Sequence, residues 1–261
     1  MAEPPVLYNI NNSLADLVAR VRMSIPGAHA GLVVLLILLV AGFSLFIPNF
    51  ASLGTLQSFM YQLPLLGLLS LAMMAPLITG GLNLAIIATT NQCALLMAFI
   101  MQSLITPDSS TGTAVAVIIL ALVAGLALCL LIGLITGSLI AYTGVHPILI
   151  TLGTKSLIDG ISIYLTRGMA LSGIPDGFSR IGTTTIVGVP LIFLLLIVVA
   201  VIVSLILRRT AFGVACAMIG SNIEAARYSA IDTRRVLVGV YVMSSLICFF
   251  AALVMLATFN S

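Results

Sequence analysis

Charged side chains are scarce in this sequence. Ten Lys and Arg and seven Asp and Glu make up 7% of the 261 residues, whereas 61% are hydrophobic and the mean hydropathy is +1.30. A soluble domain carries about a quarter charged residues. So few charges cannot cover a water-exposed surface, which excludes an ordinary soluble fold and leaves a chain whose outer surface faces lipid.

Cysteine and histidine are also few. The cysteines are dispersed, with no CxxC pair and no adjacent histidine, which favours apolar packing over a metal or redox site: Cys93, Cys129, Cys216 and Cys248. His29 and His146 each stand alone near the ends of apolar runs. We therefore expect no metal site and no catalytic cluster.

Long apolar runs dominate the chain. Because unpaired backbone groups are costly in lipid, such a chain forms either spanning helices or a closed barrel. The runs approach the ~20 residues of a spanning helix and lack the alternating pattern of a barrel strand of ~10 residues. We predict an all-α, polytopic transmembrane helical bundle of about seven spanning helices, at residues 30–47, 56–78, 82–105, 113–142, 147–166, 187–207 and 236–258.

Basic residues indicate the orientation. With a cytoplasmic N-terminus, Arg167 and Arg180 lie outside, and a larger set lies inside, as the positive-inside rule requires: Arg20, Arg22, Arg208, Arg209, Arg227, Arg234 and Arg235. Residues 1–28 then form a cytoplasmic N-terminal segment with a short amphipathic helix at 14–23, and residues 29–261 form a single transmembrane domain. No signal-peptide pattern precedes the first apolar run, so we expect that run to stay in the protein.

A polar break separates the second and third predicted spans. Gly80 and Gly81, flanked by Pro76 and Asn83, interrupt the apolar pattern, and Asn91 follows about two turns after Asn83. A broken helix at membrane depth is tolerated where it lines a cavity or is buried in protein, which suits the route of a polar solute. An ordinary tight turn is the alternative.

Two charges lie inside the fifth predicted span. Lys155 and Asp159 are four residues apart and so share a helical face, with Thr151 one turn before them. An ionisable residue costs roughly 2.5–3.5 kcal/mol at the centre of a spanning helix and usually faces protein or water. The pair either neutralises itself or lines a pathway, and both interpretations remain open.

Small residues recur at four-residue spacing in the fourth predicted span. They are Ala121 with Gly125, and Gly133 with Gly137. This spacing lets helices approach closely, so we expect a tight crossing with a neighbouring helix.

The loop at residues 208–235 has a helix–break–helix pattern. Gly220 ends one helical piece, and Ser221 or Asn222 can cap a second piece whose first turn holds Glu224. The small residues that follow would let this short helix lie flat at the membrane face and fit a groove on a partner. A solvated interfacial helix without a partner is the alternative.

The loop resembles the cytoplasmic signature of the ribose-type ABC permease family, which is close to FG-x-x-x-x-A-x-G-x-N-x-x-A-A-x-x-S-G-I. Matches fall at Phe212, Gly213, Gly220, Asn222, Ala225, Ala226, Ser229 and Ile231. Two further segments follow the family's order: 77–84 resembles its T-G-G-I-D-L-S-V-G segment, and 146–154 resembles its P-x-F-I-x-T-L-G-T segment.

The chain departs from the family pattern at several positions. Asn83 stands where the family usually has Asp, Asp159 where it commonly has Arg, and Ala230 where it usually has Gly; Ala85 and Ile87 also differ. Family members continue through further helices and a glycine-rich segment. We therefore expect the chain to be C-terminally truncated relative to the family, without its C-terminal helices.

The resemblance implies the permease subunit of a bacterial ABC importer, in the inner membrane, that translocates a sugar or similar small polar solute. A separate ATPase subunit would bind ATP and Mg²⁺, a periplasmic solute-binding protein would deliver the solute, and a second permease subunit would complete the pathway. This chain would bind no cofactor or nucleic acid and would catalyse no reaction.

The residues expected to carry these roles form two groups. The expected contacts to the ATPase are Gly220, Asn222, Glu224, Ala225, Ala226, Arg227 and Ser229. The expected pathway residues are Gly80, Gly81, Asn83, Asn91, Thr151, Lys155 and Asp159. A secondary, ion-coupled transporter is the alternative function, although it predicts paired broken helices and only one break is evident.

Overall fold

The computed structural model describes residues 30–50, 52–106, 110–169, 178, 182–186 and 188–258, and it confirms the all-α prediction. The chain divides into two compact units, residues 1–56 and 57–261. The predicted N-terminal segment at 1–28 and its amphipathic helix lie outside the described residues.

The first unit contains one complete described helix, α2 (Ala30–Phe46), which carries no charged residue. Its 17 residues span about 25 Å, slightly less than the ~30 Å hydrocarbon core. Asn49 adopts a left-handed conformation in the turn that follows, and Phe43 packs against Phe50 with ring centroids 5.5 Å apart. This helix coincides with the first predicted span.

Six described helices are long and apolar enough to cross a membrane: α3 (Leu53–Ile78), α4 (Ile86–Leu104), α5 (Thr111–Thr143), α6 (Pro147–Thr166), α8 (Leu191–Arg209) and α11 (Thr233–Thr258). Together with α2 they match the predicted spans, and the largest differences are at the starts of α4 and α8, which begin at 86 and 191 instead of 82 and 187. Two shorter helices, α9 (Ala211–Ser221) and α10 (Ile223–Tyr228), connect α8 to α11.

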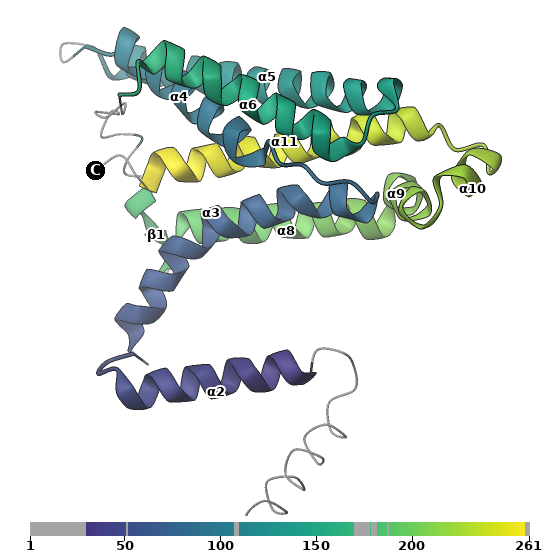
Figure 1. The fold of residues 1–261 in the computed structure, drawn as a ribbon. Helices are drawn as coiled ribbons and strands as arrows, with labels where there is room; N and C mark the ends of the chain where they lie inside the picture. Colours follow the sequence, from purple (N-terminus) through teal and green to yellow (C-terminus); the bar gives the residue numbers. More distant parts are fainter. Residues whose placement is uncertain are drawn as a thin grey trace, which may run out of the picture. The chain divides into compact units, whose positions relative to one another are not determined.

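Helix α11 lies at the centre of the second unit. Figure 1 shows it between α4, α5 and α6 on one side and α3 and α8 on the other. Its neighbouring residues Ala251 and Ala252 are both fully buried, Ala252 in a core with α4 and α5 and Ala251 in a core with α3 and α8. This two-sided burial makes α11 the element on which the rest of the unit packs.

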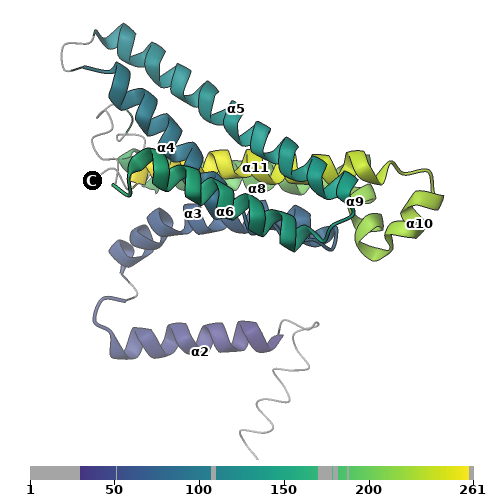
Figure 2. The same ribbon diagram turned by 45° about the horizontal axis from the view of Figure 1, so that its top comes forward.

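Helix α5 crosses α11 at the small residues that the sequence singled out. A Cβ on Gly133 would lie 2.9 Å from Val242 Cα, and a Cβ on Gly137 would lie 3.0 Å from Val238 Cα. Figure 2 shows the oblique crossing. At Gly125 the neighbour is α4, where a Cβ would meet Met97 at 2.8 Å. The predicted tight crossing is confirmed.

A short antiparallel ribbon precedes α8. It pairs β1 (Thr185–Ile186) with β2 (Val189–Pro190) around Gly188, which has a φ of 80°. The prediction of a span from residue 187 was therefore wrong at its start, because the turn and Pro190 keep this stretch extended until Leu191. Tyr61 Oη of α3 donates a hydrogen bond to the Thr183 carbonyl at 3.5 Å.

Candidate functional site

The predicted break lies between α3 and α4, where residues 79–85 are not helical. Gly80 has a φ of 79°, and its N–H donates to the Leu77 carbonyl at 3.1 Å. The Gly81 N–H donates to the Pro76 carbonyl at 2.9 Å. These are the two bonds of a Schellman motif with glycine at the left-handed position, so Gly80 sets where α3 stops.

Side chains from α6 and α11 hold the chain after the break. Thr151 Oγ1 of α6 lies 3.1 Å from the Leu82 carbonyl and 3.0 Å from the Pro147 carbonyl of its own helix, and its one proton is shared between them. Asn83 Nδ2 donates to Ser244 Oγ of α11 at 2.9 Å. Asn83 Oδ1 also accepts from the Ala85 N–H at 3.1 Å. Asn83, Thr151 and Ser244 are all buried. The extended backbone is thus paired inside the protein, as membrane depth requires.

Gly81 allows this close passage. A Cβ at this position would lie 2.7 Å from Tyr241 Oη and 3.3 Å from Pro147 Cβ. The structure therefore brings the predicted residues Gly81, Asn83 and Thr151 together at one point between α6 and α11, with Gly80 at its edge.

The remaining predicted pathway residues lie on α4 and further along α6. Lys155 Nζ and Asp159 Oδ2 form an ion pair at 2.9 Å, and their side chains are 42% and 38% exposed. The pair occupies positions 9 and 13 of the 20-residue helix α6, near its middle. Asn91 is half-buried on α4, and the next residue, Gln92, accepts a hydrogen bond from Ser162 Oγ. The Gln92–Ser162 hydrogen bond therefore joins α4 to α6.

Helix α9 packs against the ends of the spanning helices. Its second residue, Phe212, lies against Gly239 of α11, where a Cβ would approach the ring at 2.9 Å. Gly220, near its other end, touches α3, because a Cβ there would collide with the Ile78 carbonyl oxygen. Burial raises the pKa of the Cys216 thiol of α9 to about 11, so the thiol stays protonated at neutral pH.

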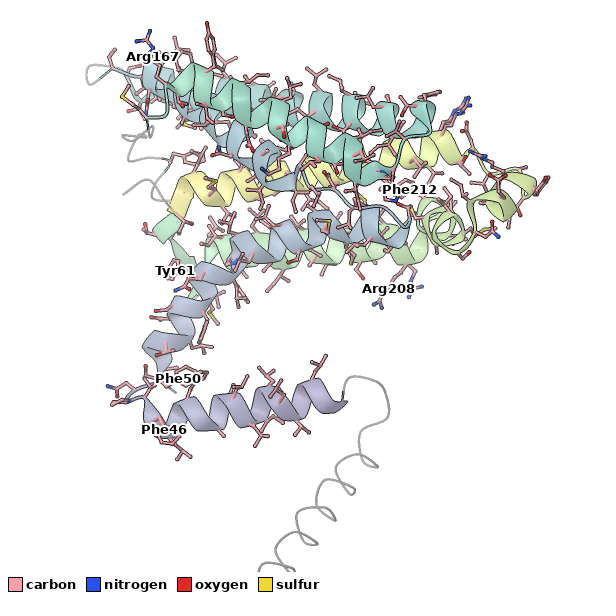
Figure 3. The ribbon with its side chains drawn as sticks, viewed as in Figure 1. Phe46, Phe50, Tyr61, Arg167, Arg208 and Phe212 are labelled. Carbon is pink, nitrogen blue, oxygen red and sulfur yellow. The ribbon has the colours of Figure 1, made fainter. Side chains whose placement is uncertain are left out.

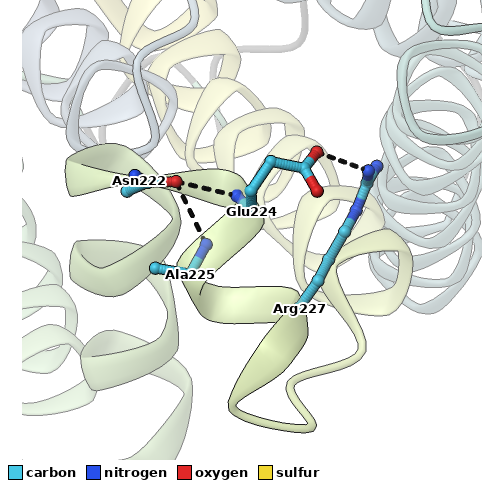
Figure 4. A network of polar contacts seen from close by, with 4 residues as sticks. All are labelled: Asn222, Glu224, Ala225 and Arg227. Carbon is cyan, nitrogen blue, oxygen red and sulfur yellow. Dashed lines mark hydrogen bonds and ion pairs between the residues drawn. The ribbon is translucent and has the colours of Figure 1, made fainter.

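The predicted cap of α10 is confirmed at Asn222. Asn222 Oδ1 accepts hydrogen bonds from the N–H groups of Glu224 and Ala225, both at 3.0 Å (Figure 4). Glu224 Oε1 in the first turn pairs with Arg227 Nη1 at 2.7 Å. The helix is therefore fixed at its N-terminus despite its length of one and a half turns.

The surface of α10 differs from the prediction at one residue. Ala226 is fully buried, so its side chain packs beneath the helix instead of facing a docked partner. Side chains two residues apart on a helix point about 200° apart. Tyr228 therefore lies on the opposite side from Ala226 and is 91% exposed. The other predicted contacts are exposed: Gly220, Asn222, Glu224, Ala225, Arg227 and Ser229.

Ala230 ends α10 in a conformation that suits glycine. Its φ is 60°, its N–H donates to the Arg227 carbonyl at 3.1 Å, and the Ile231 N–H donates to the Ala226 carbonyl at 3.2 Å. This is a second Schellman motif, with alanine where the resembled family has glycine.

We expect Ala230→Gly to stabilise this turn. Left-handed alanine costs roughly 1–2 kcal/mol, of which the extra backbone freedom of glycine in the unfolded chain offsets about 0.5–1 kcal/mol. Slower amide hydrogen exchange at Ile231 in the variant would show the gain, with Ser229→Gly as the control. Faster exchange in Ala230→Gly would contradict it.

Comparison with known proteins agrees with the resemblance to ABC permeases that the sequence indicates. The family model described as the branched-chain amino acid transport system permease component matches residues 55–261. The autoinducer 2 import system permease protein LsrD of Enterobacter sp. (strain 638) is 30% identical over 237 residues, which cover 88% of this chain and 69% of the relative. The LsrD protein of Salmonella typhi is 29% identical, covering 88% and 68%.

No solved structure matches the chain. The match of the family model begins in α3 and includes the break, the α6 ion pair and the loop that carries α9 and α10. The predicted resemblance to ribose-type permeases is thereby confirmed at the level of the family, and the chain is a multi-pass inner-membrane protein. The chain belongs to the family of branched-chain amino acid transport system permease components, as a membrane-spanning permease subunit of an ABC importer.

Proposed function

We propose that this permease subunit imports a sugar or similar small polar solute while a separate ATPase subunit, docked on α10, hydrolyses ATP. The observation that carries the proposal is the surface of α10. Its N-terminal cap and its Glu224–Arg227 ion pair fix a short helix that presents Ala225 and Tyr228 outward. An exposed tyrosine beside small residues is the type of anchor on which protein interfaces depend.

The proposed transmission route runs through α9. Gly220 lies against the Ile78 carbonyl at the end of α3, immediately before Gly80 and the extended segment that Thr151 and Asn83 hold. A displacement of α10 would therefore move α9 against α3 and strain those two hydrogen bonds. Gly80, Gly81, Asn83 and Thr151 take part by holding or releasing this segment.

The proposed solute route follows α6. Lys155, Asp159 and Asn91 supply donors and acceptors that suit the hydroxyl groups of a polar solute. A second permease subunit would close this route, and a periplasmic binding protein would deliver the solute. The relatives named for autoinducer 2 import support the inward direction of transport.

A cytoplasmic N-terminus is favoured by the positions of the arginines. Arg208 and Arg167 mark opposite ends of the second unit (Figure 3), and Arg208 lies at the more basic end.

Co-purification with the cognate ATPase tests the docking site. We expect Tyr228→Ala combined with Ala225→Arg to weaken the association about tenfold or more, because the variant removes the aromatic anchor and adds a bulky charge. Tyr164→Ala is the matched control, since Tyr164 on α6 is also a highly exposed tyrosine, at 83%. Association of the α10 variant at the level of the control would refute docking on α10.

A second variant separates docking from transmission. Gly220→Val leaves the outer face of α10 unchanged but forces α9 away from the Ile78 carbonyl. It should retain ATPase association and lose solute uptake in cells. Normal uptake in this variant would rule out the route through α9.

A further inference from the structure

We propose that the groove between α3 and α8 binds one anionic phospholipid, with its phosphate on Arg208 and Arg209 and its acyl chains along the groove. This site is separate from the solute route on α6 and from the α10 surface.

The groove consists of two adjoining cavities of about 570 and 400 Å³. Leu71 of α3 and Ala200 and Ser204 of α8 line both cavities, so the two are continuous. The small residues Gly67 and Ala200 leave space in the groove, and exposed apolar side chains such as Val201 and Leu205 form the rim of the groove. A long, open, apolar channel on the surface of the second unit suits an acyl chain.

The length of the groove matches one leaflet. Its lining runs along α8 from Leu196 to Arg208, which is about 18 Å at 1.5 Å per residue. Half of the hydrocarbon core is about 15 Å. A lipid whose headgroup lies at Arg208 would therefore have chains that reach the far end of the groove near the bilayer centre.

The charge at the open end selects the headgroup. Arg208 lines the second cavity, and Arg209 follows it at the C-terminus of α8; both are exposed. Every acid in the described part of the chain is already paired with another base, namely Asp159 with Lys155, Glu224 with Arg227 and Asp232 with Arg235. Among the described residues no acid therefore pairs with either guanidinium group, and their planar forks fit phosphate oxygens.

A protein helix would satisfy this site less well. A helix of a second subunit could fill the apolar part, but it would also have to supply acids opposite Arg208 and Arg209. A phospholipid supplies the apolar chain and the phosphate in one molecule. With the orientation proposed above, it comes from the cytoplasmic leaflet.

The absence of tryptophan from the chain makes a direct test possible. Leu205→Trp places a single tryptophan on the rim of the groove, and Val201→Trp gives a second reporter. The full chain is reconstituted in vesicles that contain phosphatidylglycerol or phosphatidylcholine brominated in the acyl chains. Quenching of the fluorescence then reports which lipid occupies the groove.

We expect both reporters to prefer brominated phosphatidylglycerol over phosphatidylcholine by about fivefold for each arginine engaged. Arg208→Gln with Arg209→Gln should reduce the ratio to about one, and high salt should lower it. Arg167→Gln, at the opposite end of the helices (Figure 3), should leave it unchanged. A control tryptophan at Leu157 of α6 should show no preference.

Three results would overturn the proposal. Equal quenching by the two lipids at both reporters would mean that the groove takes lipid without selecting charge. No quenching by either lipid at both reporters would mean that protein covers the groove. A preference that persists in the double glutamine variant would place the headgroup elsewhere and would also refute the assignment.

Discussion

A Gly137→Leu variant is expected to lose the packed transmembrane bundle, whereas Gly153→Leu is expected to keep it. Gly137 of α5 lies against the backbone of α11, where a Cβ would be 3.0 Å from both Cα and O of Val238. Backbone atoms cannot rotate away as a flexible side chain can. The larger residue must therefore push α5 and α11 apart, at a cost of about 3 kcal/mol or more.

Thermal denaturation of the purified chain, followed by size-exclusion chromatography, measures this effect. Gly153 is the matched control because it is also a glycine in a spanning helix, yet nothing lies within 4 Å of a Cβ built there. Similar melting temperatures for the two variants would show that the α5–α11 crossing can relax and is not the rigid centre of the fold.

Asp159→Ala is expected to destabilise the protein and to abolish uptake. It leaves the Lys155 ammonium without its partner at 2.9 Å, near the middle of a spanning helix. The cost approaches the roughly 3 kcal/mol that a lone charge at a helix centre incurs on insertion. Membrane expression level and melting temperature measure the stability, and solute uptake by the complete importer measures the function.

The double variant Lys155→Met, Asp159→Leu separates the two interpretations of the pair. It removes both charges, so stability should return to the wild-type level or above. If the pair lines the solute route, as proposed, uptake should remain abolished although the protein is stable. Restored uptake would show that the pair only neutralises itself and would remove α6 from the proposed route.

The spans could be predicted well because lipid imposes their length and composition. Helix α6 has the predicted bounds at both ends, and the structure places Pro147 at its first position with His146 before it as the cap. Asn222 was likewise recognisable as a cap from its local pattern. Signals of this kind reside within a few neighbouring residues, so a single sequence shows them.

Contacts between distant segments could not be predicted. Asn83 pairs with Ser244 across 161 positions, and nothing local indicates that partner. The inward Ala226 and outward Tyr228 depend on how α10 is rotated against the bundle, which the loop composition does not determine. The late start of α8 was missed because Val189 and Pro190 are apolar but form a strand after a left-handed glycine.

The helices of the second unit are held with very unequal strength. Along α6 only Thr151, Ile158 and Ser162 are buried. Cavities of about 520 and 600 Å³ flank α6 on its α5 and α4 sides. By contrast, α5 and α11 touch backbone to backbone.

Such a distribution favours shear motion of a single helix over rocking of the whole bundle. Helix α6 packs on α4 and α5. Its displacement relative to the α5–α11 pair would break the hydrogen bond from Thr151 to Leu82. Because Lys155 and Asp159 move with α6, a displacement by one helical turn, about 5.4 Å, would carry the only charged pair described within a spanning helix past fixed neighbours. The helix whose displacement opens the solute route would then also carry the residues that contact the solute.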